Sequence, residues 1–254
     1  MKYSVVIPAR MDSSRFPGKP LEKIAGLPLV EHVRRRALLA SGVDQVVVAT
    51  CDIQIKDYIE SQGGIVVMTS DSHERCTARV AEAAQSMKCD YVAVVQGDEP
   101  LLFPESIEQA VAPFLDGEDV DCVSLLSPLE GREDLGNTNI VKAACNLNQR
   151  ILYFSRAAIP HFQASEKDPP VYRETGIRAL THDFLMKYAS LEETPLERIE
   201  SVDMFRLLEH GFSILGVKTD YATIGVDHPE DVTIAERMLS EDPVQQKWFK
   251  QILN

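Results

Sequence analysis

The sequence lacks the features of several classes of protein. Its 254 residues contain no apolar run long enough for a secretory signal or a membrane-spanning helix. Lys and Arg number 26 against 39 Asp and Glu, and the resulting net charge of −13 argues against a nucleic-acid-binding surface, which needs clustered basic residues. We therefore expect a cytoplasmic enzyme that contacts neither nucleic acid nor a membrane.

Paired cysteines are missing as well. The chain has no CxxC motif and no histidine at the spacing of a zinc site. We therefore expect neither a disulfide framework nor structural zinc, and we predict that all five cysteines are reduced. These are Cys51, Cys76, Cys89, Cys122 and Cys145.

Repeats and low-complexity tracts are also absent. Apolar residues make up 44% of the chain, which suffices for one large core and a smaller lobe. We therefore predict a single domain over residues 1–254.

Apolar, β-branched runs alternate with helical patterns in the first part of the chain. The runs predict strands at 3–7, 45–49, 64–68 and 91–95. Helical patterns lie between them at about 28–41, 52–62 and 74–87. This alternation indicates an α/β fold with a doubly wound, mostly parallel sheet, in which ligands bind beyond the carboxyl ends of the strands.

After residue 120 the pattern changes. Strand-like segments follow one another without full crossover helices, at 121–126, 140–145 and 150–155, and they predict a mixed-sheet extension. The polar segment 161–171 contains Pro-Pro and predicts a mobile loop. The remaining segments predict a strand at 211–217, a helix at 228–242 and a short amphipathic helix at 243–254 that packs on the body of the protein or on a partner.

A basic loop follows the first predicted strand. Arg10, Arg15 and Lys19 come directly after the apolar run, with Gly18 and two prolines among them. Three cations at the carboxyl end of a strand suit a polyphosphate, because arginine offers phosphate a planar fork and lysine a compact charge. Gly18 lets backbone N–H groups come close to an anion. An ordinary basic surface loop is the alternative that the spacing alone leaves open.

Two aspartates also lie just beyond apolar runs, Asp98 in VVQGDEP and Asp227 in GVDHPED. Two carboxylates at a sheet edge, together with substrate phosphates, make a suitable Mg²⁺ site. Taken singly, an aspartate in a turn is more often a turn former or a helix cap. The residues alone leave both interpretations open.

Five ordered motifs carry a resemblance that covers almost the whole chain. They are IPAR with SSRFPGKPL within 7–21, VVQGDEPL at 94–101, LYFSRAAIP at 152–160, PLERIESVDMFRLLEHG at 195–211 and GVDHPEDV at 225–232. Together they resemble the 3-deoxy-manno-octulosonate (Kdo) cytidylyltransferases, which make CMP-Kdo. The resemblance implies a nucleotide-diphospho-sugar transferase-like fold. It also implies that the anomeric hydroxyl of a 2-keto-3-deoxy sugar acid attacks the α-phosphate of CTP and releases pyrophosphate.

The resemblance assigns roles to individual residues. Asp98 and Asp227 hold Mg²⁺, and together with the cations Arg10, Arg15 and Lys19 they form the predicted catalytic set. The predicted nucleotide-binding residues are Arg10, Ser14, Arg15, Lys19, Thr77, Arg79 and Gln96. The predicted acceptor-binding residues are Arg156, Glu174, Arg178, Glu200 and Asp203. The family is also expected to form homodimers, here through a lobe within about 120–215, with Trp248 and Phe249 as contributors.

Some of these residues have an ordinary structural alternative. Gln96 resembles the base-contacting residue of the family, but a buried amide can equally bind backbone. Arg156 resembles the arginine that binds the substrate carboxylate, and a structural ion pair is its alternative. Glu197 and Glu200 alternate with apolar residues at helical spacing within 196–206, so they can also form the solvated face of one helix.

The chain departs from the family pattern in two segments. Residues 73–79 read HERCTAR where the family usually has His-x-Ser-Gly-Thr, an acid and Arg, so Cys76 replaces a glycine. Glu174 and Arg178 stand where the family has histidine and tyrosine, and Met204 replaces a glutamine. One explanation is drift with a compensating Glu174–Arg178 pair. The other is an altered acceptor, a modified Kdo with an amino-substituted or deoxygenated tail.

Two further functions stay open. One is a nucleotidyltransferase of the same fold that acts on another acidic metabolite. The other is a non-catalytic descendant that binds a nucleotide or a partner. The presence of both Asp98 and Asp227 argues against the second, because a binding module has little need for two metal carboxylates.

Overall fold

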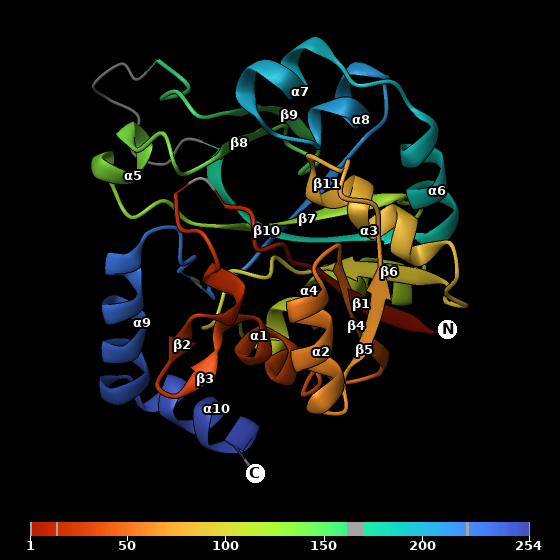
Figure 1. The fold of residues 1–254 in the computed structure, drawn as a ribbon. Coiled ribbons are helices and arrows are strands. Elements are labelled where there is room, and N and C mark those ends of the chain that lie inside the picture. The colour runs from red at the N-terminus through yellow and green to blue at the C-terminus, as the bar shows by residue number, and fades with distance from the viewer. Residues whose placement is uncertain (1, 14, 162–169, 222–223, 254) are drawn as a thin grey trace.

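The computed structural model describes residues 2–13, 15–161, 170–221 and 224–253, and one sheet of nine strands forms the centre of these residues (Figure 1). Ser14 and most of the predicted mobile loop at 161–171 lie outside the described residues. The strands of the sheet are β1 (Tyr3–Pro8), β4 (Val43–Thr50), β5 (Ile65–Met68), β6 (Tyr91–Val94), β7 (Cys122–Ser127), β8 (Lys142–Cys145), β9 (Ile151–Ser155), β10 (Val171–Thr181) and β11 (Leu215–Lys218).

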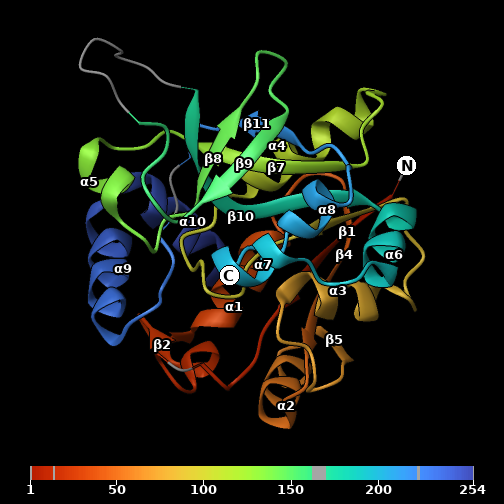
Figure 2. The same cartoon turned by 90° about the horizontal axis from the view of Figure 1, so that it is seen from above.

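The order of the strands confirms the predicted fold class. They lie in the order β11-β7-β10-β6-β1-β4-β5, and β1 pairs in parallel with both β4 and β6. Every residue of β1 is buried, as expected for a parallel strand with helices on both faces. Strand β10 runs antiparallel to β6, β7 and β8, and it carries the hairpin of β8 and β9 (Figure 2). The predicted mixed-sheet extension is therefore confirmed.

Helices cover both faces of the sheet. One face carries α1 (Leu29–Ala37), α2 (Ile53–Ser61) and α4 (Pro104–Leu115). The other face carries α3 (Cys76–Ala84), α6 (His182–Ser190), α7 (Pro195–Glu200) and α8 (Phe205–Glu209). Around these layers lie η1 (Lys19–Leu21), β2 (Lys23–Ile24), β3 (Leu27–Pro28), α5 (Arg132–Gly136), α9 (Pro229–Glu241) and α10 (Pro243–Leu253).

The prediction of a single helix over 196–206 is wrong. The segment forms two short helices, α7 and α8, because Ser201 adopts a left-handed conformation with φ of 55°. Glu197 is buried and makes two hydrogen bonds with Arg206, at 2.8 and 2.7 Å, so it is not part of a solvated face. Ile199, which the helical spacing placed on the apolar side, is exposed.

The C-terminal helix α10 packs on the body of the protein. Phe249 stacks on His32 of α1 with 5.5 Å between ring centroids, and it contacts an apolar cluster that includes Ile24 and Leu239. The five cysteines are free, and Cys122 in β7 and Cys145 in β8 are buried. In the described ranges, no helix combines the length and the apolar character needed to cross a bilayer.

Candidate functional site

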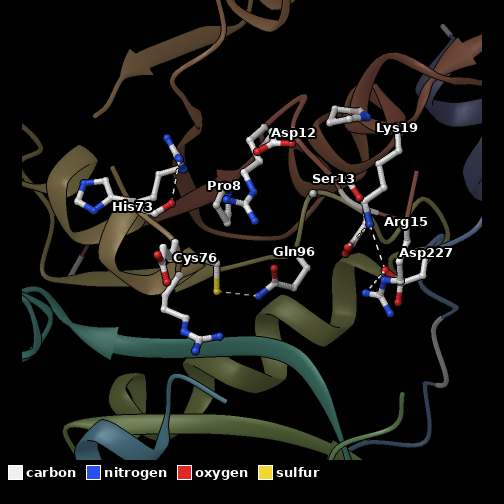
Figure 3. A pocket seen from close by; sticks show the side chains of 17 residues that line it. Pro8, Asp12, Ser13, Arg15, Lys19, His73, Cys76, Gln96 and Asp227 are labelled. Carbon is white, nitrogen blue, oxygen red and sulfur yellow. Dashed lines mark hydrogen bonds and ion pairs between the residues drawn. The ribbon is translucent and has the colours of Figure 1, made fainter. Parts of the chain in front are cut away.

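The basic loop and the two aspartates meet at one end of the sheet. Lys19 Nζ donates hydrogen bonds to Asp98 Oδ2 at 2.8 Å and to Asp227 Oδ1 at 3.2 Å. Arg15 Nη2 reaches the same Asp227 oxygen at 2.9 Å. Figure 3 shows Lys19, Arg15 and Asp227 converging on one side of the cavity. Residues that are 208 positions apart in the sequence thus form one charged cluster.

Local structure explains why these side chains converge. Gly18 has φ of +77°, a conformation that favours glycine, and it turns the chain into η1 so that Lys19 faces the sheet edge. Asp98 follows β6, and Asp227 lies two residues before α9. Burial opposes the charge on Lys19, but the two carboxylates prevail and raise its pKa.

The two carboxylates also fit a divalent cation. The hydrogen bonds described above use one oxygen of each, Oδ2 of Asp98 and Oδ1 of Asp227. Mg²⁺ is commonly held by one or two carboxylates with substrate phosphates and water, rather than by a cage of protein ligands. In the part of the chain that the structure describes, no group of three or more His, Cys, Asp or Glu side chains could hold a metal. The donor set therefore fits a metal that arrives with a phosphate.

A first cavity of about 270 Å³ lies beside this cluster. Of the predicted catalytic and nucleotide-binding residues, it is lined by Arg10, Arg15, Lys19, Arg79, Gln96, Asp98 and Asp227. Thr77 is not among the described residues that line it, because Thr77 is buried and its hydroxyl donates to Asp203 at 2.6 Å.

Arg79 supports the wall of this cavity. Its Nη1 donates to Thr69 Oγ1 at 2.6 Å and to the carbonyl oxygen of Ser70 at 3.1 Å. His73 hydrogen-bonds to Glu82, whose carboxylate also accepts from the Ser70 amide. The 70–73 segment is therefore held against α3.

A second, larger cavity of about 450 Å³ opens from the same cluster. It shares Arg10, Arg15, Gln96, Asp98 and Asp227 with the first cavity. Its remaining wall includes four predicted acceptor-binding residues, Arg156, Glu174, Arg178 and Asp203. The fifth, Glu200, is not among the described lining residues; it accepts from the backbone amide of Arg156 at 2.8 Å and so supports that residue.

The contacts of Arg156 bear on its two interpretations. Its guanidinium donates to the carbonyl oxygens of Glu200 at 2.7 Å, Thr138 at 3.2 Å and Ser201 at 3.3 Å. No carboxylate of the described residues lies within 4.0 Å of its side-chain nitrogens, so its charge is oriented but has no ionic partner there. This arrangement favours an anion-binding arginine over a structural ion pair.

Glu174, Arg178 and Asp203 form a buried ion network in the wall of the second cavity. Arg178 binds Glu174 Oε1 at 3.1 Å and Asp203 Oδ1 at 2.8 Å, and all three side chains are at most 6% exposed. Thr77 donates to Asp203 through both its amide and its hydroxyl. Burial opposes the charge on Asp203, but Arg178 and the Thr77 hydroxyl lower its pKa. The compensating Glu174–Arg178 pair is therefore present, with Asp203 as a third member.

Two residues were missed in the sequence, one that lines the second cavity and one that lies behind it and supports Arg156. Asn139 lines the cavity and accepts from Arg15 Nη1 at 3.4 Å. Lys142 is buried, and its Nζ donates to the carbonyl oxygens of Asn137, Ile140 and Arg156. A lysine within the apolar run IVKAAC was the available signal for Lys142, because a charge in such a run needs several acceptors. No local signal marked Asn139.

The chain is similar to known proteins over almost its whole length. Residues 4–217 match the family described as cytidylyltransferase. A 3-deoxy-manno-octulosonate cytidylyltransferase of Acaryochloris marina is 41% identical over 95% of this chain and 98% of its own. Another of the same name, from Chlorobium limicola, is also 41% identical, over 94% of this chain and 98% of its own.

Solved structures agree. CMP:2-keto-3-deoxy-manno-octonic acid synthetase, complexed with CTP, is 34% identical, has a TM-score of 0.89, and is matched over 95% of this chain and 100% of its own. A cytidylyltransferase from Leptospira borgpetersenii has a TM-score of 0.66 over 99% of this chain and 92% of its own. At 19% identity it shows the shared fold.

The Arg178 network predicts an unusual dependence of stability on pH. We expect Arg178→Met to lower the free energy of unfolding by about 3 to 5 kcal/mol at pH 8, because two buried carboxylates lose their partner. In the wild type the pKa of Asp203 is lower in the folded protein than in the unfolded chain, where it is about 3.9. Asp203 therefore contributes fully to the free energy of unfolding above this pH, and the contribution is lost as the pH falls from there through the folded pKa. Without Arg178, burial raises the pKa of Asp203, so the deficit should shrink from pH 8 to pH 5 as this carboxylate takes up a proton.

Urea unfolding at several pH values measures this difference. Arg198→Met is the matched control, since Arg198 forms an exposed pair with Glu193 and its loss should cost under about 1 kcal/mol at every pH. A deficit for Arg178→Met that stays constant between pH 8 and pH 5 would contradict the burial of unpaired carboxylates.

Proposed function

Because this chain belongs to the cytidylyltransferase family, alongside the Kdo cytidylyltransferases, we propose that it transfers CMP from CTP to Kdo and releases pyrophosphate. The observation that carries the proposal is the bridge from Lys19 to both Asp98 and Asp227, at the edge shared by the two cavities. A reacting phosphate at this edge is within reach of a nucleotide in one cavity and a sugar acid in the other.

The charges divide the site into two sides. On the nucleotide side, Arg10, Arg15 and Lys19 face the triphosphate, and Gln96 faces the base. On the acceptor side, the oriented guanidinium of Arg156 binds the carboxylate of the sugar acid, supported by Glu200 and Lys142 through the backbone of residue 156. The anomeric hydroxyl then lies near Asp98 and Asp227.

The reaction forms a bond between the anomeric oxygen and the α-phosphorus and breaks the bond from that phosphorus to the pyrophosphate oxygen, while the hydroxyl proton is released to water. Negative charge grows on the α-phosphate and on the leaving pyrophosphate, so fixed cations that face both groups stabilise the transition state. We propose that Asp98 and Asp227 would hold Mg²⁺ together with the substrate phosphates, and that the ion would supply positive charge and make the attacking hydroxyl more acidic. Lys19 and Arg15 keep the two carboxylates together before substrate binds.

An assay of pyrophosphate release tests the proposal. The four nucleoside triphosphates are each combined with Kdo and with a panel of other acidic metabolites. CTP with a Kdo-type acid is expected to give the highest kcat/KM. Release with a different acid would favour another nucleotidyltransferase of this fold, and binding of CTP with no release for any acid would favour a non-catalytic protein.

A modified Kdo with an amino group in its tail is the second candidate acceptor. The observation that favours it is the charge of the buried network, in which one guanidinium faces two carboxylates, Glu174 and Asp203. A surplus negative charge with little solvent screening attracts an ammonium group in the adjoining cavity. The Glu174–Arg178 pair limits this attraction, because it already engages one oxygen of Glu174.

A homodimer is our further proposal for this chain. The hairpin of β8 and β9 within the 120–215 segment presents Leu147 and Leu152, which are 100% and 62% exposed. Apolar side chains that project from a sheet extension suit a self-complementary contact. Phe249, in contrast, is engaged with His32 of its own chain.

We expect Asp98→Asn and Asp227→Asn each to lower Mg²⁺-dependent pyrophosphate release by more than about 10²-fold while the fold stays intact, because the amide keeps the shape and loses the ligand charge. Asp44→Asn is the control, since Asp44 forms a surface pair with Lys2 far from the cluster. Turnover within about tenfold of wild type in either variant would remove that residue from the metal site.

For the second candidate acceptor, the wild type is expected to use an amino analogue of Kdo at least about fivefold better in kcat/KM than Kdo itself, which corresponds to about 1 kcal/mol. Glu174→Gln should abolish most of this preference by removing the surplus charge, and Glu192→Gln, an exposed site, should leave it unchanged. Equal or better use of unmodified Kdo by the wild type would refute the modified acceptor.

Light scattering is expected to give twice the mass of one chain at micromolar concentration. Replacing both Leu147 and Leu152 with Asp should shift the protein to the monomer, because the contact would then bury unpaired charges. Leu253→Asp, at another exposed apolar site, should not. A monomeric wild type would end the dimer proposal.

A further inference from the structure

Gln96 lies where the two cavities meet, just beyond the end of β6. Its amide nitrogen Nε2 donates a hydrogen bond to Cys76 Sγ at 3.2 Å, the dashed line in the lower part of Figure 3. A carboxamide has a donor end and an acceptor end, and a ligand in the cavity meets whichever end is turned toward it. The direction of the hydrogen bond to Cys76 therefore decides what Gln96 offers.

That direction is set by the ion network behind Cys76. The thiol donates to Asp203 Oδ2 at 3.1 Å, and Arg178 Nη1 binds the other oxygen of the same carboxylate at 2.8 Å. An ionised carboxylate can only accept hydrogen bonds, so the thiol hydrogen points to Asp203. The sulfur lone pairs are then acceptors, for Gln96 Nε2 at 3.2 Å and for Arg178 Nη1 at 3.8 Å. Desolvation and the charge of Asp203 raise the pKa of Cys76 to about 12, so the thiol keeps its hydrogen at neutral pH.

Packing holds Gln96 from the opposite side. Gly176 on β10 has φ of +80°, and a Cβ at this position would lie 2.8 Å from Gln96 Cγ. The glutamine stem therefore lies directly against backbone, and the amide is placed between that backbone and the Cys76 sulfur. With its nitrogen committed to the sulfur, its oxygen Oε1 is turned away from Cys76, where a ligand can donate to it (Figure 3).

We propose that Cys76 is a positioning residue. Its thiol is oriented by the Arg178–Asp203 pair and in turn orients the amide of Gln96, and this orientation of the amide selects cytosine over uracil. Cytosine carries an exocyclic amine that can donate to Gln96 Oε1, whereas uracil has a carbonyl oxygen at the same place, which Oε1 would repel. The inference rests on the proposed function, since it concerns the base of the nucleotide substrate.

The proposal gives a common reason for the two segments in which the chain departs from the family pattern. Cys76 belongs to the first segment, 73–79, and Arg178 to the second, 174–178. In the folded chain both side chains contact the same carboxylate, that of Asp203. The substitutions therefore form one network that ends on the amide of Gln96.

The test compares kcat/KM for CTP and UTP, with saturating Kdo, in three proteins. Cys76→Ala removes the sulfur and frees the amide to turn, so the ratio of CTP to UTP should fall at least about fivefold. Cys76→Ser is the matched control, because a hydroxyl can also donate to Asp203 and accept from Gln96, and its ratio should stay within about twofold of wild type. Circular dichroism and thermal unfolding verify that both variants are folded.

A second pair of variants separates positioning of Gln96 from general damage to the site. In Gln96→Glu both side-chain oxygens accept hydrogen bonds, so what the residue offers a base no longer depends on its orientation. The double variant Gln96→Glu with Cys76→Ala should therefore have the same CTP to UTP ratio as Gln96→Glu alone. An unchanged ratio in Cys76→Ala alone, or an equal loss in Cys76→Ser, would overturn the role of Cys76. A wild type with no turnover of CTP would instead refute the proposed function.

Discussion

The Arg178 guanidinium ties together three segments that are remote in the sequence. It binds Glu174 on its own strand β10 and Asp203 in the turn before α8, and Asp203 in turn holds Thr77 at the start of α3. Burying these charges is costly, and it is tolerated because each has an oppositely charged partner and further hydrogen bonds. This part of the wall of the second cavity therefore depends on directional contacts rather than on apolar packing, and substitutions that keep the volume but remove the charge would disturb it.

Directionality has a chemical consequence. An apolar wall would leave a neighbouring amide free to turn either way, whereas an ionised carboxylate orders the donors and acceptors along a chain of hydrogen bonds. Asp203 orders the thiol of Cys76, and the thiol orders Gln96. The buried charge of Asp203 thereby determines which atom of Gln96 faces a nucleotide base.

The end of the sheet where Lys19 meets Asp98 and Asp227 is organised by local charge instead. The three cations Arg10, Arg15 and Lys19 lie there. Together with Arg75 and Arg79 they outnumber the four carboxylates that line the first cavity, those of Asp12, Glu74, Asp98 and Asp227, so the site carries a local surplus of positive charge in a protein whose net charge is −13. A local surplus of this kind attracts a triphosphate while the rest of the surface repels it. Lys19 is the most deeply held of the three cations, because it donates to both carboxylates and to a backbone carbonyl.

Periodicity and local motifs were sufficient for much of the fold. The buried strand β1 and its parallel neighbours follow from continuous runs of β-branched residues, because such runs suit a sheet covered on both faces. The predicted helix over 196–206 failed at Ser201, whose left-handed conformation ends α7 and lets Glu197 turn inward to Arg206. Helical spacing carries no information about such a break, since it is decided by the contacts that the turn makes possible.

Sequence patterns did not predict α4, α6 or strand β10, which pairs with β6, β7 and β8. The sequence by itself determined the alternating strands and helices of the parallel half, the loops that carry the cations and carboxylates, and the family, because these depend on local pattern and on motifs. Only the tertiary structure decided which of these side chains meet. Lys19 reaches Asp227, and Cys76 reaches Asp203, through contacts across more than a hundred residues. In the sequence Arg178 could be either an acceptor ligand or one half of an ion pair. The fold surrounds it with two buried carboxylates, whose attraction offsets the cost of burying the guanidinium charge.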